Sequence, residues 1–302
     1  MRDLNKMDLT VIMVNYKCDL AKLHNCLKSI NINIDVLIID HSNDLDRNEL
    51  DIPKNINLKI IKNQNRGNGA GINCGIENSK TKYVLYLDID TILPQNFFSK
   101  LENTVKIIQE FAVIAPKIGN FYNEKRINRY GNLSILKYFY NKFFYNLKKD
   151  NDLSENLKQV FFVSGSIMLI NKEAIFKKKI KFDENIFLFF EEDDFFHQCF
   201  KSKLKIYLIN DLDAIHLDGS ISDKSLNFEC FKKWHWEWSK YYFLNKHYLK
   251  IFVFFLAMKN IFKFIVKMII FYILNKKKFK ITQSRLAGII GFYLKKKCQI
   301  HF

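Results

Sequence analysis

Proline and glycine are scarce in this chain, with 3 prolines and 10 glycines among 302 residues. Asn, Lys, Ile and Phe are abundant instead, a bias that we attribute to an AT-rich genome and to no function. Because 48% of the residues are hydrophobic, the chain can bury a substantial core, and we do not expect disorder. The length allows one large domain or two.

Motifs for metal clusters and for export are also missing. The six cysteines form no C-x-x-C pair, and a chain with a core of this size does not need disulfides. We therefore expect a reducing compartment and no structural zinc site. The apolar run LTVIMV at 9–14 is too short for a signal h-region, so we expect a cytoplasmic protein.

Acidic residues are nearly absent from the C-terminal quarter of the chain. From residue 231 to 302 there are sixteen Lys and Arg and one acid, Glu237, so this segment carries +15 of the formal net charge of +17. Such a block is typical of proteins that contact a polyanion, either nucleic acid or an anionic membrane surface. No nucleic-acid-binding module accompanies the charge, and we expect no nucleic-acid partner.

The apolar segment 251–274 is long enough to suggest a transmembrane helix, but Lys259, Lys263 and Lys267 interrupt it. A lysine at the bilayer centre costs about 2.5 to 3.5 kcal/mol, which argues against a spanning helix. Lysines at spacings of four form one basic stripe on an otherwise apolar helix, and three tryptophans lie just upstream in WHWEWSKYY. This pattern favours a helix that lies in the membrane interface. The alternative is an amphipathic helix packed on the rest of the protein.

Short β-rich runs alternate with helical patterns in the N-terminal third. The helical segment DLAKLHNCLKSI lies between the first two runs and repeats its apolar residues at helical spacing. This alternation predicts an α/β fold, with a Rossmann-like, mostly parallel sheet flanked by helices. The predicted strands are 9–14, 35–40, 58–61 and 84–88. Ligands gather at the carboxyl ends of such strands, which selects Asn15, Asp40, Asp88 and Asp90.

Further elements are predicted after residue 160. The segment FFVSGSIMLINKEAIF at 161–176 predicts a strand followed by a helix, and FLFFEEDDFFHQCFKSK at 187–203 predicts a buried run that enters a helix. Another strand is predicted at 205–209. The polar residues 120–158 are predicted as loops and short helices, and no internal repeat is visible.

Two carboxylates, Asp88 and Asp90, end the buried run VLYLD. In a fully extended chain they would share one face and repel each other, so a positive group is expected between them. A divalent cation such as Mg²⁺ or Mn²⁺ prefers oxygen ligands and bridges to phosphates of a substrate. The alternative is a solvated turn, because Asp is a common turn residue.

A short glycine loop, NQNRGNGAGINCG, precedes this strand. Gly67, Gly69 and Gly71 let the backbone approach a ligand closely, as loops that bind phosphate do. Loop, helix, strand and acid follow one another in dinucleotide-binding folds too. The spacing here is G-x-G-x-G, and a ribose-binding Asp88 needs no second carboxylate at Asp90, so a dinucleotide site is the weaker interpretation. A third interpretation of the glycines is a tight turn that binds no ligand.

Four carboxylates, Glu191 to Asp194, lie between two pairs of phenylalanines in FFEEDDFF. Burial of an unpaired carboxylate is costly or raises its pKa. Acids at a helix N-terminus, where they complement the helix dipole, are the simple interpretation. A carboxylate with a raised pKa also suits a general base that acts on a hydroxyl group. His216, which ends the strand-like DAIH, is by itself more typical of a satisfied histidine than of a ligand.

Together these segments resemble the family 2 glycosyltransferases with the GT-A fold, and within them the rhamnosyltransferase-like branch. The matching segments are, in order, TVIMVNYK, LIIDHSND, NQNRGNGAGINCGI, YVLYLDIDT, SGSIMLINKEAIF, FDENIFLFFEEDDFFHQC and AIHLDGS. One such motif would be unspecific, but seven in the family's order are specific. The resemblance implies a catalytic domain over 1–225, and the charge and hydropathy pattern predicts a basic, membrane-associating helical region over 226–302.

The resemblance also implies roles for individual residues. A nucleotide-diphosphate sugar would be bound by Asn15, Asp40, Arg66, Gly67, Gly69 and Asp88, with Asp40 at the base. Mn²⁺ or Mg²⁺ would be held by Asp88, Asp90 and His216. The acceptor would contact Gly165, Glu191 and Asp194. Glu192 falls at the catalytic base of an E-D/E-x-D signature, and Asp193 takes that place if the signature slides by one residue.

The implied reaction is a single displacement with inversion. The base removes a proton from the acceptor hydroxyl, which attacks the anomeric carbon as the nucleotide diphosphate leaves. The acceptor would be a saccharide or a lipid-linked saccharide of bacterial surface polysaccharide or lipooligosaccharide synthesis, at the inner face of the cytoplasmic membrane. An NAD-dependent reductase and a non-enzymatic polyanion-binding protein are the alternatives.

Overall fold

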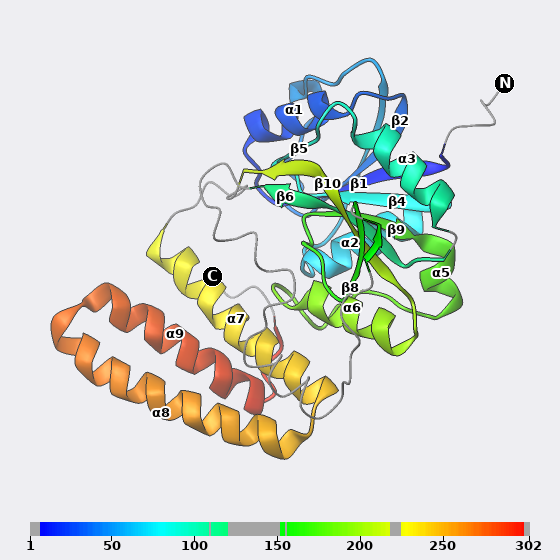
Figure 1. Cartoon of the computed structure of the whole chain (residues 1–302). Coiled ribbons are helices and arrows are strands. Elements are labelled where there is room, and N and C mark those ends of the chain that lie inside the picture. The colour runs from blue at the N-terminus through cyan, green and yellow to red at the C-terminus, as the bar shows by residue number, and fades with distance from the viewer. Residues whose placement is uncertain (1–6, 109, 120–151, 155, 218–224, 299–302) are drawn as a thin grey trace. The chain divides into compact units, whose positions relative to one another are not determined.

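The computed structural model describes residues 7–108, 110–119, 152–154, 156–217 and 225–298 (Figure 1). The chain divides into two compact units. The first comprises Met1–Asn65, Gly71–Lys181 and Phe195–Ser222, and the second comprises Arg66–Ala70, Phe182–Asp194 and Asp223–Phe302. The second unit therefore takes in two segments from within the predicted catalytic domain 1–225, while a functional boundary after residue 225 stays a prediction.

A mixed sheet forms the first unit, with the strand order β3-β2-β1-β4-β9-β6-β10-β8-β7 in the part that the structure describes. The strands β3, β2, β1 and β4 are parallel, β9 runs antiparallel between β4 and β6, and β6 pairs in parallel with β10. The bounds are β1 Leu9–Asn15, β2 Ile34–Asp40, β3 Ile56–Lys62, β4 Tyr83–Leu87, β5 Thr91–Ile92, β6 Val113–Gly119, β7 Asp152–Ser154, β8 Leu157–Val160, β9 Ile167–Asn171 and β10 Ile206–His216.

Helices flank this sheet and form most of the second unit (Figure 1). Their bounds are α1 Leu20–Ser29, α2 Asn68–Asn78, α3 Phe97–Ile107, α5 Lys172–Lys177, α6 Glu191–Lys201, α7 Leu226–His247, α8 Lys250–Leu274 and α9 Lys276–Tyr293, with a 3-10 turn η1 at Arg47–Glu49. The helices α2 and α6 each begin in the second unit and continue into the first. Their first turns therefore belong with the C-terminal helices.

The strands β1, β2 and β4 form where the sequence predicts them, and their apolar residues are buried on both faces. All but one residue of β1 is buried, and so is all but one of β2. Between them, α1 begins at Asp19, whose side chain accepts a hydrogen bond from the backbone N–H of Ala21 at 3.0 Å, and buries Leu23 and Leu27. In the parallel pairing of β1 and β2, Asn15 lies opposite Asp40. The mostly parallel α/β sheet is thus confirmed.

The prediction of loops and short helices over 120–158 is wrong at its C-terminal end. Residues 120–151 and 155 lie outside the described residues, but β7 and the start of β8 fall within the predicted loop region. In β8 only Leu157 is buried, because the strand lies near the edge of the sheet and pairs antiparallel with β10. A strand that buries one residue has no hydrophobic pattern to reveal it.

The second unit contains a long helix, α7, and a hairpin of α8 and α9 that lie side by side (Figure 1). Helix α7 begins at Ser225, whose hydroxyl accepts a hydrogen bond from the backbone N–H of Phe228 at 3.1 Å. The buried Glu237 of α7 forms an ion pair with Arg285 of α9. None of the helices in the described ranges combines the length and the apolar composition needed to span a membrane.

Candidate functional site

Asp88, Asp90 and His216 come together just beyond the carboxyl end of β4. One ligand atom of each residue lies within 4.8 Å of the others. His216 Nε2 lies 3.0 Å from Asp90 Oδ1 and 3.4 Å from Asp88 Oδ2. The Asp90 side chain is 2% exposed, whereas Asp88 and His216 are partly open to solvent. Two carboxylates and one imidazole at these distances form a donor set that fits a divalent cation.

A turn after β4 creates this cluster. Thr91 donates two hydrogen bonds to the backbone oxygen of Asp88, at 3.1 Å from its N–H and 2.7 Å from its hydroxyl. The short β5 then pairs antiparallel with β10, which sets Thr91 opposite His216. The two carboxylates therefore lie on a turn and not along one face of an extended strand. The pairing of β5 with β10 places His216 beside the two carboxylates, whereas the sequence pattern alone favours a histidine that binds no ligand.

Tyr86, which the sequence analysis missed, supports the cluster from within β4. Its hydroxyl donates a hydrogen bond to Asp88 Oδ1 at 2.6 Å, and the residue is 1% exposed. The hydrogen bond occupies one oxygen of the carboxylate and leaves Oδ2 on the side of His216. Its place two residues before Asp88 on the same strand is the signal that could have identified it, since alternate residues of a strand share a face.

Asn15 and Asp40 form a second polar cluster at the carboxyl ends of β1 and β2. Both are fully buried. Asp40 accepts hydrogen bonds from Asn15 Nδ2 at 2.8 Å, from the Ser42 hydroxyl at 2.7 Å and from the backbone N–H of Leu45 at 3.1 Å. Burial raises the pKa of Asp40, but these hydrogen bonds outweigh it and the pKa is lowered. Because the Asp40 side chain is buried, its contact with the nucleotide base stays a prediction.

The orientation of the Asn15 amide follows from this arrangement. Because a carboxylate only accepts hydrogen bonds, the Asn15 nitrogen must face Asp40, and its oxygen then points away. That Oδ1 atom is buried and has no hydrogen-bond partner among the described residues. A buried acceptor without a donor is rare in folded proteins and calls for a ligand or a water.

The glycine loop is explained by packing. Gly67 has φ 101°, and a Cβ atom there would collide with the backbone oxygen of Phe187. At Gly69 a Cβ atom would lie 3.0 Å from the Phe182 side chain. The neighbouring Arg66 forms an ion pair with Glu184 at 3.1 Å. Nucleotide binding by Arg66, Gly67 and Gly69 stays a prediction beside this structural role.

Residues 191–194 form the first turn of α6, as the simple interpretation predicts. Glu191 and Asp194 are buried, whereas Glu192 and Asp193 are half-buried. Burial, and then the charge of Glu192, raises the pKa of Glu191 well above its ordinary value. Asn68 Nδ2 lies 3.3 Å from its Oε1, while its Oε2 has no hydrogen-bond partner among the described residues.

Gly165 lies in the turn before β9, beside the end of β4. The following residue, Ser166, accepts a hydrogen bond through its backbone oxygen from the N–H of Asp88 at 2.8 Å. This contact extends the pairing of β4 with β9, in which Leu87 lies opposite Ile167. The structure thus brings Gly165 near Asp88, within the first unit. Its contact with an acceptor stays a prediction.

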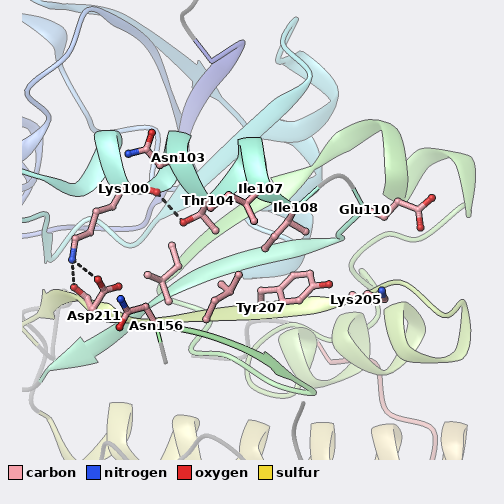
Figure 2. A pocket seen from close by; sticks show the side chains of 12 residues that line it. Lys100, Asn103, Thr104, Ile107, Ile108, Glu110, Asn156, Lys205, Tyr207 and Asp211 are labelled. Atoms are coloured by element: carbon pink, nitrogen blue, oxygen red, sulfur yellow. Dashed lines mark hydrogen bonds and ion pairs between the residues drawn. The ribbon is translucent and has the colours of Figure 1, made fainter. Parts of the chain in front are cut away.

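A separate pocket of 770 Å³ lies between α3 and the strands β8 and β10 (Figure 2). Lys100 of α3 reaches across to Asp211 of β10, with Nζ 2.9 Å from Oδ2. Tyr207, Ile209 and the C-terminal end of α3 form its apolar lining. None of the site residues predicted from the sequence lines this pocket, and we assign it no part in the site.

Comparisons with known proteins show the family of this chain. The model of glycosyl transferase family 2 matches residues 10–176, which is more than half of the chain. An uncharacterized glycosyltransferase of Methanocaldococcus jannaschii is 23% identical over 272 residues, which cover 83% of this chain and 87% of that protein.

Solved structures of similar fold have low sequence identity to this chain. A crystal structure of GalNAc-T7 with UDP, GalNAc and Mn²⁺ has a TM-score of 0.53 at 15% identity, over 80% of this chain and 50% of that one. A fragment of S. aureus TarS has a TM-score of 0.51 at 13% identity, over 97% of this chain and 76% of that one. The chain thus spans half the length of the GalNAc-T7 structure. These likenesses show the fold, and with the family match they identify the chain as a glycosyltransferase of glycosyl transferase family 2 with a GT-A fold.

Proposed function

We propose that this enzyme transfers a sugar from a nucleotide-diphosphate sugar to a saccharide or lipid-linked saccharide, with inversion at the anomeric carbon. The cluster of Asp88, Asp90 and His216 at the end of a parallel strand is the observation that carries the proposal. Family membership favours this reaction over hydride transfer by a reductase. The synthesis of bacterial surface polysaccharide or lipooligosaccharide is the proposed pathway, and the rhamnosyltransferase-like branch is the proposed lineage.

The three clustered residues would hold Mn²⁺ or Mg²⁺. Carboxylates suit both ions, and an imidazole ligand favours Mn²⁺ of the two. The ion, when bound, supplies positive charge that neutralises the leaving diphosphate. The GalNAc-T7 structure, which contains UDP and Mn²⁺, supports this choice by fold alone. Tyr86 fixes the Asp88 carboxylate through its hydrogen bond, as groups behind a metal ligand commonly do.

Asn15 is the residue that we propose to recognise the nucleotide base. Its buried Oδ1 can accept a hydrogen bond from a ring N–H or an amino group of the base, and Asp40 holds the amide in that orientation. In this arrangement Asp40 does not contact the nucleotide base itself but orients the Asn15 amide that does. Direct contact by Asp40 is the alternative that the resemblance implies.

Glu192 is the proposed general base, with Asp193 as the alternative. Both are half-buried on the first turn of α6, so a hydroxyl group of an acceptor can reach them. Glu191 and Asp194 are buried and bonded within the protein, through Asn68 and through Lys246 and His247. The carboxylate takes the acceptor proton as the acceptor oxygen attacks.

The experiment that tests the proposal is a screen of donor hydrolysis and transfer. UDP-glucose, UDP-galactose, UDP-GalNAc and dTDP-rhamnose are each supplied with Mn²⁺ or with EDTA, and the anomeric configuration of any product is read by NMR. We expect one donor to be turned over only with Mn²⁺, with inversion. Glu192→Gln is expected to slow transfer about 10²- to 10⁴-fold. Full activity of this variant would refute Glu192 as the base, and retention of configuration would refute the single displacement.

We further propose an anionic membrane surface as a partner, at the inner face of the cytoplasmic membrane. Helix α8 is attached to the protein by a narrow stripe in which Val253, Ala257 and Phe264 are buried. The opposite side exposes a continuous apolar face, since residues of a helix advance by about 100° each. Its members are Phe255, Met258, Phe262, Ile265, Ile269 and Ile273, all 42% to 84% exposed. A patch of this extent is typical of an interaction surface.

Charge selects the kind of partner for this face. Lys259, Lys263 and Lys267 are exposed along one side of it, and no acid follows Glu237 in the sequence. An apolar face bordered by lysines is how a helix in a membrane interface is built. Each lysine near an anionic surface contributes about 1 kcal/mol of attraction. The aliphatic and aromatic side chains would then enter the headgroup region.

Sedimentation with lipid vesicles tests this part of the proposal. We expect the wild type to pellet with vesicles of phosphatidylglycerol and phosphatidylcholine at low salt, without detergent. The triple change Lys259→Glu, Lys263→Glu and Lys267→Glu should weaken binding at least about tenfold. Exposed lysines elsewhere give a matched control of equal charge, namely Lys54→Glu, Lys80→Glu and Lys177→Glu. A wild type that stays in the supernatant would refute the membrane partner. Light scattering that shows self-association through the apolar face of α8 would refute it too.

A further inference from the structure

We infer that helix α7 positions the first turn of α6, with Lys246 and His247 as its positioning residues. The inference rests on the proposed role of Glu192 and names residues that neither the family match nor the sequence motifs include. The family model ends at residue 176, whereas α7 spans Leu226–His247. All the contacts that carry the inference lie within the second unit.

The C-terminal end of α7 holds the Asp194 carboxylate. Lys246 Nζ lies 2.9 Å and 3.0 Å from its two oxygens, and His247 Nε2 lies 2.6 Å from Oδ1. The side chain of Asp194 is 0% exposed and that of His247 is 4% exposed. A buried carboxylate with two such partners has little freedom to rotate.

Lys246 also binds the start of the segment 183–190, which leads into α6. Its Nζ lies 2.6 Å from Asp183 Oδ2, to which Tyr242 of α7 donates a further hydrogen bond at 3.0 Å. One lysine thus joins both ends of the segment 183–194. Burial lowers the pKa of Lys246, but its hydrogen bonds to Asp183 and Asp194 outweigh that effect and raise it, so the ammonium group stays charged.

The turn between these two carboxylates is strained and is held by α7 as well. Phe189 and Phe190 have φ values of 64° and 66°, a region that bulky residues rarely adopt. Both rings pack edge-on against Trp236, with centroids 5.2 Å apart. The Ser239 hydroxyl donates a hydrogen bond to the backbone oxygen of Leu188 at 2.8 Å. Strain of this kind persists only where neighbouring groups impose it.

Helix geometry links this attachment to the proposed base. Residues two apart on an α-helix project about 200° from each other, so Glu192 and Asp194 lie on nearly opposite sides of α6. Burial agrees, because Asp194 is buried and Glu192 is half-buried. With Asp194 fixed against α7, the rotation of the helix is set and the direction of Glu192 follows.

Lys246→Met tests the inference, with Lys246→Arg as the conservative variant and Lys240→Met as the matched control. Lys240 is also on α7 and also pairs with a buried carboxylate, Glu237, but that carboxylate belongs to α7 itself. We expect Lys246→Met to lower kcat at least tenfold with the KM for the donor unchanged, and Lys246→Arg to recover most of the loss. Lys240→Met is expected to keep wild-type kcat at a similar loss of melting temperature.

Hydrogen exchange provides a readout without any substrate. Peptides that cover 187–195 should exchange faster in Lys246→Met and in the second variant His247→Gln, and at the wild-type rate in Lys240→Met. Unchanged exchange in the first two variants, or equal kcat for Lys246→Met and Lys240→Met beside an inactive Glu192→Gln, would overturn the inference. An active Glu192→Gln would instead overturn the proposed base and leave the exchange result as an independent test of the attachment.

Discussion

His216 Nε2 lies 3.0 Å from Asp90 Oδ1, although one residue ends β10 and the other follows β4. The Asp90 carboxylate is 2% exposed, so most of the hydration that water would give it is lost. The imidazole of His216 and the carboxylate of Asp88 lie beside it, and the three groups form a donor set that could hold a cation. The pairing of β5 with β10 is what keeps the set assembled.

Removal of the histidine should weaken metal binding measurably. We expect His216→Ala to lower the affinity for Mn²⁺ alone about 10- to 100-fold, since one of the three proposed ligands is lost. Electron paramagnetic resonance of free Mn²⁺ measures this without a donor. His24→Ala is the control, because His24 lies on α1 and contacts the backbone N–H of Asp51. Equal Mn²⁺ affinity of wild type and His216→Ala would exclude the histidine as a ligand.

Replacement of Asn15 should weaken the binding of the nucleotide and leave the affinity for the metal unchanged. Asn15→Ala removes the buried acceptor, and a hydrogen bond of this kind contributes about 0.5 to 1.5 kcal/mol, or a 2- to 12-fold change in affinity for UDP. Ser42→Ala is the comparison, because Ser42 also donates to Asp40, while its hydroxyl already accepts hydrogen bonds from Asn15 Nδ2 and the backbone N–H of Lys17. Calorimetry with UDP and Mn²⁺ compares the two. If Ser42→Ala weakened UDP binding as much as Asn15→Ala, recognition by the Asn15 oxygen would be wrong.

Gly67 should tolerate no side chain. With φ 101° and the backbone oxygen of Phe187 where a Cβ atom would lie, Gly67→Ala is expected to destabilise the fold by at least about 2 kcal/mol. At Gly119 the nearest atom to an added Cβ lies 3.8 Å away, so Gly119→Ala should change little. Thermal melting of the two variants tests the difference. Similar melting temperatures would show that the loop glycines are not required for packing.

The ion pairs of Asp194 with Lys246 and His247 should make the free energy of unfolding depend on pH. Burial raises the pKa of Asp194, but His247 and Lys246 outweigh it, so the folded pKa lies below the ordinary value of 3.8. A carboxyl with a lowered folded pKa adds stability above its unfolded pKa and loses it as pH falls through the folded value.

Asp194→Asn is therefore expected to cost about 3 kcal/mol of unfolding free energy at pH 7, and less below pH 3.8. The exposed pair of Lys100 and Asp211 is the comparison, and Asp211→Asn should cost no more than about 1 kcal/mol. Urea titrations at pH 7 and pH 3 measure both variants. A loss for Asp194→Asn that is the same at both pH values would contradict the assigned pairing.

Much of the fold is predictable from local pattern, because β1, β2, β4 and α1 bury regular sets of apolar residues. The positions of Asp88 and Asp90 follow from that pattern, since they come directly after a buried strand. His216 does not follow from it, because its approach to Asp90 depends on the pairing of two distant strands. Resemblance to the family supplied what local pattern could not.

Other features had no signal in the sequence at all. The edge strand β8 buries one residue, and the contact between Lys246 and Asp194 joins segments that share no motif. Packing accounts for Gly67, because a side chain there would collide with the backbone of Phe187, while contact of the loop with a nucleotide stays a prediction. Contacts between polar side chains that lie far apart in the chain are the part of the site that cannot be predicted from a single sequence.

Calorimetric titration of UDP, GDP and dTDP with Mn²⁺, and of NADH, into the wild type and Asp90→Ala tests the central claim most directly. The account predicts that one nucleoside diphosphate binds the wild type only when Mn²⁺ is present, that Asp90→Ala abolishes this binding, and that NADH does not bind. Equal binding of the nucleotide by Asp90→Ala, or binding of NADH in place of every nucleoside diphosphate, would contradict it.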